Sequence, residues 1–458
     1  MCFTFNQDDN KMKKFLNISL WSLLALSALT LGSCKNEVDE IFDEDAVTRL
    51  EKAKAQFTDI LTSNGGKWQM EYFANADEPG YIYVMTFRKD GSVTISGKNK
   101  WIGGLSGNTG TDAYGSETSL WEVVNDNGPV LSFNSYNKYF HVFSDPTGIN
   151  EGDENGLTNK GRGHEGDYEF DLMKYSNDTL YVSGKKHGIN MIMTRIDETI
   201  NDEVYINEVF AMADSFFHRK IPQVYINLPN GVRWIVKNGS TKILTMFREG
   251  DDEITQSQTH NIIITHDGLS FMNPLTLDGY VIQNFVRQPD GSLICRDDNQ
   301  TTMTADELSK FIGATTLTWV VDQNQNNMGG IYADYIPGIK SEFNDFGSYK
   351  LSTIDIAYVS SMERYSITFN AKKKTTTYTP TFYFTIEPIG DDQVKFTFDP
   401  EGNPQGEMFI AQSESLKNMI QALGNATYDL SANSLLAPLT MKLAESGNSS
   451  NFMYWKLQ

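Results

Sequence analysis

Beyond residue 66 the chain consists mostly of short segments in which apolar and polar residues alternate, separated by turn dipeptides. This pattern constrains its fold more than any other feature. In "YIYVMTFRKDGSVTISG" apolar and polar residues alternate on both sides of Asp90-Gly91, and "DYEFDLMKYSNDTLYVSGKKHG" does the same around Asn177-Asp178. Alternation with a period of two is typical of half-buried strands, and such dipeptides close tight antiparallel hairpins. The sequence therefore predicts a mainly β protein with antiparallel sheets and a few helices.

Helical periodicity interrupts the strands in four places, near residues 46–61, 202–218, 304–312 and 413–423. Thr304 and Glu307 have the spacing of a capping box ahead of the third of these helices. A further hairpin is expected around Asn238-Gly239. We place a domain boundary near residue 200, which gives a leading helix with an antiparallel β unit over 46–200 and a β-rich region with helices over 201–458. A further boundary near 300 would make three β-rich domains instead of two.

The N-terminus has the order of a secretory signal over residues 1–33. Three lysines (Lys11, Lys13 and Lys14) precede the apolar run 15–31, which is short for the roughly 20 residues that span a bilayer. Met12 is a more natural start than Met1, because two aspartates stand ahead of the lysines; residues 1–11 then lie outside the signal. "LGSC" at 31–34 resembles the bacterial lipobox, so we expect a lipidated Cys34 followed by an acidic tether that extends to residue 45.

The charge of the chain argues against nucleic acid as a partner. The formal net charge is -21, and removal of three lysines and two aspartates with the signal takes it to -22. Such a chain is repelled by phosphate backbones. Of three cysteines, one is lost with the signal and Cys34 carries lipid, so Cys295 has no partner for an intramolecular disulfide.

Motifs that carry chemistry are mostly absent from the sequence. No HExxH, CxxC, GxSxG or phosphate-binding loop occurs, so no catalytic residue and no cofactor are assigned. His260 and His266 lie near strand ends, but surface histidines beside turns are common and no metal is assigned to them. A pair of glycosidase carboxylates cannot be recognised from spacing.

Two segments are candidates for ligand binding. Glu151, Asp153 and Asn155 imitate the start of an EF-hand loop, although Arg162 stands where its bidentate glutamate belongs, which leaves an irregular calcium loop or a plain acidic loop. The glycine-rich segment 101–115 is expected to be a loop that holds Trp101 and Tyr114. Exposed aromatic rings stack on sugars, whereas a tryptophan that covers the end of a barrel has a structural role; both interpretations stay open.

Four segments together resemble a known family. They are "NGGKWQMEYF", "GYIYVMTFRKDGSVTIS", "VLSFNSYNKYFHVFSDP" and "GDYEFDLMKYSNDTLYVSGKKHG", and they are similar to Bacteroidota lipoproteins grouped as a domain of unknown function, family 4302. The resemblance is best over residues 45–200. It implies an accessory role beside SusC/SusD-type outer-membrane uptake systems and transfers no catalytic residue. Gly66-Lys67-Trp68 also looks like the opening of lipocalin-like barrels, in which the tryptophan plugs one end.

Three functional hypotheses follow. The first is a non-enzymatic lipoprotein of the outer membrane, exposed at the cell surface, that binds a glycan or peptide or docks with the transporter. The acidic residues after Cys34 are similar to a surface-export signal, with the periplasmic face as the alternative location. The second is a hydrolase that trims such polymers, and the third is an adhesin or structural surface protein without a small ligand. A buried cluster of carboxylates or histidines with room for substrate would favour the hydrolase.

Overall fold

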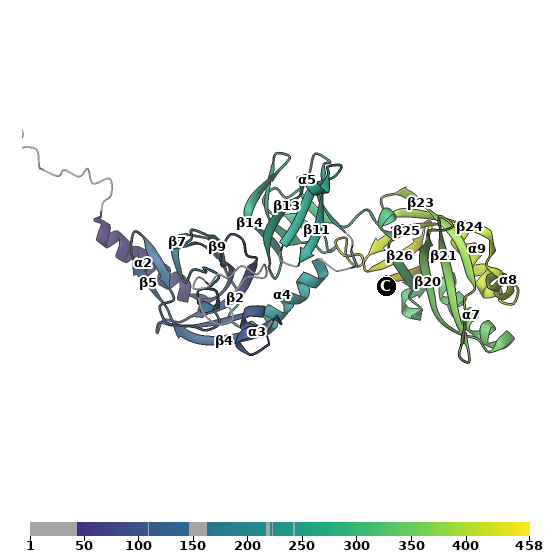
Figure 1. Cartoon of the computed structure of the whole chain (residues 1–458), viewed down its shortest axis with the longest axis horizontal. Coiled ribbons are helices and arrows are strands. Elements are labelled where there is room, and N and C mark those ends of the chain that lie inside the picture. The colour runs from purple at the N-terminus through teal and green to yellow at the C-terminus, as the bar shows by residue number, and fades with distance from the viewer. Residues whose placement is uncertain (1–43, 109, 146–162, 217–219, 222, 241–242) are drawn as a thin grey trace, which may run out of the picture. The chain divides into compact units, whose positions relative to one another are not determined.

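A computed structural model describes residues 44–108, 110–145, 163–216, 220–221, 223–240 and 243–458. The chain divides into two units, with the boundary between residues 56 and 57. Within the second unit the described strands build three antiparallel sheets (Figure 1), so the expectation of a mainly β protein with several β-rich domains is confirmed. The described helices are α2 (Ala46–Thr62), α3 (Lys100–Leu105), α4 (Asp202–Phe216), α5 (Glu253–Gln256), α6 (Leu308–Ile312), α7 (Ile331–Gly347), α8 (Pro404–Ile410) and α9 (Glu414–Asn425).

The first sheet follows the strand order of an up-and-down barrel that is open at one place. Strands that follow one another in the chain are neighbours, and β1 also pairs with β9, but no ladder joins β4 to β5 among the described residues. The strand order thus agrees with the expected lipocalin-like unit, whereas the ring of hydrogen bonds is incomplete. The strands are β1 (Lys67–Phe73), β2 (Gly80–Phe87), β3 (Ser92–Asn99), β4 (Ala113–Leu120), β5 (Glu122–Asn125), β6 (Pro129–Ser132), β7 (Glu169–Ser176), β8 (Thr179–Gly184) and β9 (Asn190–Arg195).

Aromatic side chains fill the inside of this first sheet. Tyr72 is buried at its centre, with ring centroids 5.3 Å from Phe140, 5.4 Å from Phe143 and 5.8 Å from Tyr83. Rings at these distances are in edge or tilted contact and occupy the space that an internal ligand would need. The inside of the first sheet is therefore a packed core, and a ligand site has to be sought on its outer side.

The second sheet is a closed barrel, which the sequence did not predict. Its first strand β10 pairs with its last strand β17, so every strand has two neighbours. The hairpin expected around Asn238-Gly239 does join β11 to β12, but Asn238 and Gly239 both lie within β11, whose Ser240 pairs with Ile243 of β12. The strands are β10 (Val224–Asn227), β11 (Arg233–Ser240), β12 (Ile243–Arg248), β13 (Gln258–Ile264), β14 (Gly268–Leu277), β15 (Tyr280–Arg287), β16 (Leu293–Cys295) and β17 (Thr302–Thr304).

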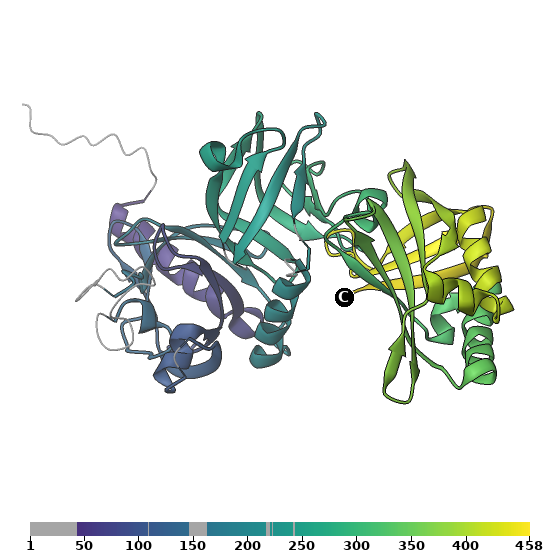
Figure 2. The same ribbon diagram turned by 45° about the vertical axis from the view of Figure 1, so that its right-hand side comes forward.

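The third sheet also closes on itself, because β18 pairs with both β20 and β27. Helices α7, α8 and α9 gather at one side of it (Figure 2). The strands are β18 (Thr318–Val321), β19 (Met328–Gly329), β20 (Lys350–Val359), β21 (Arg364–Lys373), β22 (Thr376–Tyr378), β23 (Thr381–Gly390), β24 (Gln393–Gly402), β25 (Thr427–Ala432), β26 (Thr440–Glu445) and β27 (Asn448–Leu457).

One sequence-based expectation about the helices is wrong, and the structure has helices that the sequence did not predict. The capping box does not form: Thr304 ends strand β17 and accepts a hydrogen bond from the Asn227 side chain, and Glu307 precedes α6 without a capping hydrogen bond. Helix α7 was not predicted, because Pro337 and two glycines lie within it. Proline and glycine are poor helix formers, but burial of Tyr332 and Ile339 against the third sheet outweighs that preference.

Candidate functional site

Strand β1 is buried on both of its faces. Trp68, Met70 and Tyr72 point into the first sheet, as their alternation predicts. The polar residues between them point outward, yet Gln69 and Glu71 are only 5% and 6% exposed. Polar side chains are seldom buried to this extent unless they are paired or have a function, so the outer face of β1 is a candidate location for a site.

Helix α4 covers part of this outer face. It begins where the Asn201 carboxamide oxygen accepts the backbone N–H of Val204, 3.0 Å away, as at a regular N-cap. From its first turns Asp202 forms an ion pair with Lys67 at 3.0 Å, and the Tyr205 hydroxyl donates to the Gln69 carboxamide oxygen at 2.8 Å. The buried polar groups Lys67 and Gln69 are thereby satisfied by α4.

Beyond Tyr205, the outer face of the first sheet borders a cleft of about 710 Å³. Strands β1, β8 and β9 form one wall, and strands β14 and β15 of the closed barrel form the other. This volume lies in the usual range for ligand sites, about 300 to 1,000 Å³. Amide and hydroxyl side chains contribute much of the lining, namely Gln69, Thr179, Asn190, Thr194, Gln283 and Asn284.

Glu71 is the buried acid of this cleft. Burial, and to a smaller extent the charge of Asp267, raise the pKa of its carboxyl to about 8, while the charge of Arg296 opposes the rise. Asp267 and Arg296 form an ion pair at 3.0 Å on the barrel side. Because the pKa lies above 7, Glu71 carries its proton at neutral pH and presents both a donor and an acceptor to the cleft.

His266 and Tyr205 form a second feature of the cleft. Their rings stack with centroids 4.7 Å apart and planes inclined by 7°, and the His266 Nε2 lies 3.1 Å from a Glu208 carboxylate oxygen. Nearby, Tyr181 of β8 is 42% exposed and offers part of its ring to the cleft. The cleft thus combines a neutral acid, a guanidinium, several amides and aromatic rings, a set suited to polar ligands of low net charge.

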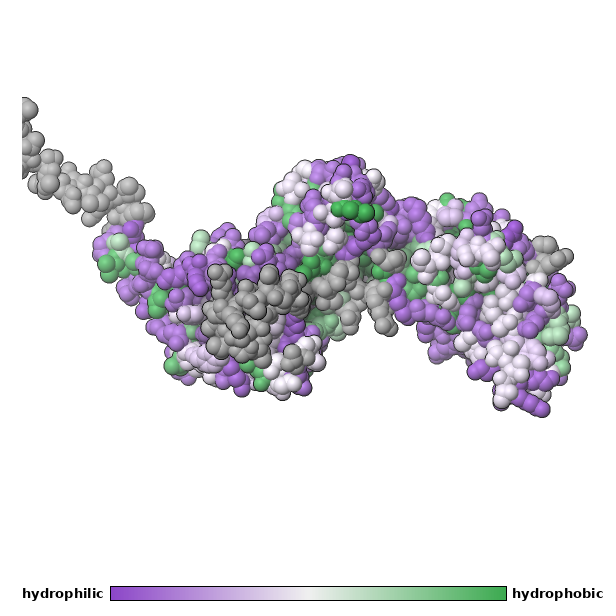
Figure 3. Space-filling view, in the orientation of Figure 1, coloured by the Kyte–Doolittle hydropathy of each residue, from purple (hydrophilic) through white to green (hydrophobic). Residues whose placement is uncertain are grey.

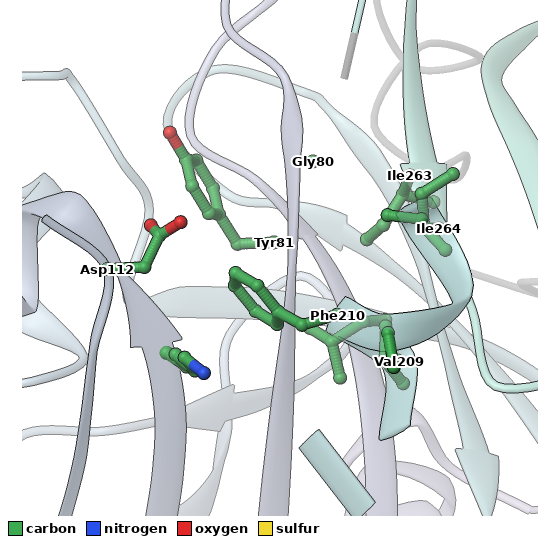
Figure 4. A pocket seen from close by; sticks show the side chains of 11 residues that line it. Gly80, Tyr81, Asp112, Val209, Phe210, Ile263 and Ile264 are labelled. Atoms are coloured by element: carbon green, nitrogen blue, oxygen red, sulfur yellow. The ribbon is translucent and has the colours of Figure 1, made fainter. Parts of the chain in front are cut away.

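A smaller hollow lies farther along α4. It has a volume of about 300 Å³ and is bordered by β2, β3, α4 and β13 (Figure 4). Its lining includes Tyr81, Val209, Ile263 and Ile264, all buried, so it is far more apolar than the cleft. On the face drawn in Figure 3 the surface is mostly hydrophilic, and its hydrophobic patches are small and separate.

The aromatic pair chosen from the sequence lies elsewhere. Trp101 belongs to helix α3, capped by the Asn99 side chain, so the expectation of a loop over 101–115 is wrong at both ends: Tyr114 belongs to strand β4. The Trp101 ring is half-buried, 4.2 Å from His164, and its N–H donates to the Tyr81 hydroxyl at 3.3 Å. Neither Trp101 nor Tyr114 lines the cleft or the smaller hollow, and their role in ligand binding stays a prediction.

Cys34 and the calcium candidates Glu151, Asp153 and Asn155 lie outside the described residues. In the described part of the chain, no group of three His, Cys, Asp or Glu side chains could hold a metal ion. Across the same residues, no helix is both long and apolar enough to pass through a bilayer.

The residues of the cleft were missed by sequence reasoning. Glu71 and Gln69 occupy the polar positions of an alternating strand, which predicts exposure to solvent. Asp267 and Arg296 lie in turns, where charged residues are ordinary. Only the packing of the closed barrel against the first sheet brings these side chains together, and nothing in their local sequence signals it.

Fold and cleft define a β protein built from successive barrel-like sheets, with a polar cleft beside the first of them. The chain belongs to the family described as Domain of unknown function (DUF4302), whose model matches residues 38–289. This range includes β1, α4 and both walls of the cleft up to β15. The family resemblance seen over the N-terminal half is thereby confirmed.

Comparison with curated proteins finds no match. Among solved structures, the DNA polymerase β subunit of Streptococcus pyogenes is 10% identical, with a TM-score of 0.13 over 88% of this chain and 97% of that chain. The DNA polymerase III β sliding clamp of Bartonella birtlesii is 8% identical, with a TM-score of 0.13 over 89% of this chain and 98% of that chain. Scores this low establish no common fold, and they carry no argument about function.

Proposed function

We propose that this protein is an accessory lipoprotein of a SusC/SusD-type nutrient-uptake system of the Bacteroidota, which captures a glycan or a peptide in the cleft beside β1. The cleft of about 710 Å³ lined by amide, hydroxyl and aromatic side chains is the observation that carries the proposal. Glycans and peptides offer many uncharged hydrogen-bonding groups, and these match such a lining. The packed interior of the first sheet supports a site on its outside.

Attachment is proposed to occur through lipid on Cys34, at the outer face of the outer membrane. The charge-then-apolar order of residues 11–31 and the lipobox-like residues before Cys34 support it. Three acyl chains bury many methylenes at about 0.8 kcal/mol each, which would make attachment effectively permanent. The acidic tether after Cys34 would hold the folded domains away from the membrane.

Membrane attachment and partnership can be tested together. Tagged wild-type protein solubilised from outer membranes is expected to bring down a SusC/SusD-like pair, identified by mass spectrometry, and to incorporate labelled palmitate. Cys34→Ser should lose the label and leave the membrane fraction, because the thiol that carries lipid is gone. Label on the wild type without the transporter pair would contradict the partnership, and an unlabelled wild type would contradict the anchor.

Ligand capture in the cleft is tested with Tyr181→Ala. Binding of short oligosaccharides and short peptides to the wild type is measured by calorimetry, and loss of one aromatic contact is expected to weaken it by about tenfold, or about 1.4 kcal/mol. Tyr136→Ala is the matched control, since Tyr136 is 61% exposed and does not line the cleft. Equal affinity of wild type and Tyr181→Ala for every bound compound would remove the cleft from the proposal.

A hydrolase is the second candidate, and one observation favours it. A carboxyl with pKa raised to about 8 beside a second carboxylate, Asp267, is what a general acid requires at neutral pH. The incubations above are therefore also followed for cleavage products by mass spectrometry. Products that form with wild type and not with Glu71→Gln would replace binding by hydrolysis as the function, with Glu71 as the acid.

A further inference from the structure

The hollow of about 300 Å³ beside α4 is separate from the cleft and has a different chemical character. Its shape depends on Gly80 at the start of β2. A Cβ on Gly80 would lie 2.7 Å from the Cβ of Ile263 and 2.8 Å from the Phe73 ring, so only glycine lets β13 approach β2 this closely. The hollow is therefore a fixed feature of the way β2 and β13 pack.

One end of the hollow is apolar. Figure 4 shows Ile263, Ile264 and Val209 on one side and the Asp112 carboxyl on the other, with the rings of Tyr81 and Phe210 between them. Val209, Ile263 and Ile264 are buried at 4%, 1% and 7% exposure, so their side chains are fixed by packing. Such an end accepts an aliphatic or aromatic side chain and excludes charge.

The other end is charged with both signs. The Lys98 ammonium donates to the Asn207 carboxamide oxygen at 2.7 Å and lies 4.7 Å from the centre of the Phe210 ring. Within the described residues, no carboxylate lies within ion-pair distance of Lys98, so its charge is not neutralised locally. An ammonium has three donors, and two of them stay available to a ligand carboxylate. Asp112 is exposed and can accept from a ligand ammonium.

The combination selects one class of ligand. We infer that this hollow binds an apolar amino acid, either free or as the terminal residue of a short peptide. Its side chain lies between Phe210 and Ile263, its α-carboxylate faces Lys98 and its α-ammonium faces Asp112. The volume is at the lower limit of small-ligand sites, about 300 Å³, which suits one residue and not a longer polymer.

Calorimetry with the full mature chain and three probes tests the inference. L-leucine carries both charges, L-leucinamide only the ammonium, and N-acetyl-L-leucine only the carboxylate. We expect Lys98→Met to lower the affinity for N-acetyl-L-leucine about tenfold, because one charge-assisted contact is lost, and to leave the affinity for L-leucinamide unchanged. Asp112→Asn should lower the affinity for L-leucinamide and leave that for N-acetyl-L-leucine unchanged. The affinity for L-leucine should fall in both variants. If one of the two single-charge probes binds more tightly, it shows which end of a peptide is bound. If L-leucine binds more tightly than both, the ligand is the free amino acid.

Two further variants keep the result interpretable. Lys442→Met is the matched control, because the Lys442 ammonium also lies over a ring, that of Phe452 at 4.4 Å, in the third sheet. Ala211→Trp fills the hollow from exposed Ala211 and should abolish binding of all three probes while the thermal unfolding curve is retained. Absence of binding by the wild type overturns the inference, and so do equal effects of Lys98→Met and Lys442→Met.

Discussion

Glu71→Gln is expected to be more stable than the wild type at pH 8 and equally stable near pH 4. Burial raises the pKa of the Glu71 carboxyl from 4.5 in the unfolded chain to about 8 in the folded protein. Below the lower value the carboxyl is protonated in both states, and glutamine replaces a neutral group of the same shape. The difference between the two proteins should therefore appear only as the pH rises.

The direction in which the free energy of unfolding changes with pH follows from proton binding. Between pH 4.5 and 8 the unfolded chain releases the proton of Glu71 while the folded protein keeps it, so each pH unit lowers the free energy of unfolding by about 1.4 kcal/mol. Above the folded pKa both states are ionised and the loss is complete. The wild type should thus lose up to about 4 kcal/mol through this group between pH 5 and pH 8, and Glu71→Gln should not.

Urea unfolding at several pH values between 4 and 9 checks this expectation for both proteins. Glu387→Gln is the control, since Glu387 is an exposed glutamate on a strand of the third sheet. Both wild type and Glu387→Gln should lose stability with pH, and the curve of Glu71→Gln should be flatter. Parallel curves for all three proteins would mean that Glu71 ionises normally in the folded state, and the cleft would then contain no neutral acid.

Trp68→Ala is expected to destabilise the first sheet by about 3 to 5 kcal/mol, the usual range for a buried tryptophan. Trp68 is fully buried, and its indole N–H donates to the Leu61 carbonyl at 2.9 Å. The Arg195 guanidinium lies 4.1 Å from the centre of its ring and also donates to the carbonyl oxygens of Ser63 and Ile60. The truncation therefore leaves a large cavity and breaks the contacts that fasten the end of α2 to β1 and β9.

Hydrogen–deuterium exchange of the full chain localises this effect. Exchange in peptides of β1 and β9 should accelerate in Trp68→Ala, while peptides of the third sheet should be unchanged. Trp68→Phe keeps most of the packing and should cost about 1 to 2 kcal/mol through the lost hydrogen bond. A double-mutant cycle with Arg195→Met should give a coupling of about 0.5 to 2 kcal/mol; additive effects would show that the guanidinium and the ring do not interact.

Local patterns were sufficient for most of the strands and hairpins. The alternation in β1 to β3 and the turns at Asp90-Gly91 and Asn177-Asp178 specify strands and hairpins through short-range sterics. Helix α4 followed from the 3.6-residue recurrence of Ile206, Val209 and Phe210, of which the first two are buried. Helix α7 was not predicted because it is stabilised by packing against the third sheet and not by the helix propensity of its residues.

The sequence by itself thus determined a mainly β protein with antiparallel sheets, because side-chain alternation and turn chemistry act between neighbours in the chain. Closure of the second and third sheets depends on pairing between strands far apart, such as β10 with β17 and β18 with β27. The cleft and the hollow were decided only by the tertiary structure. The alternating pattern of β1 predicts that Glu71 is exposed to solvent. Its burial and raised pKa arise only when a second sheet covers the outer face of β1.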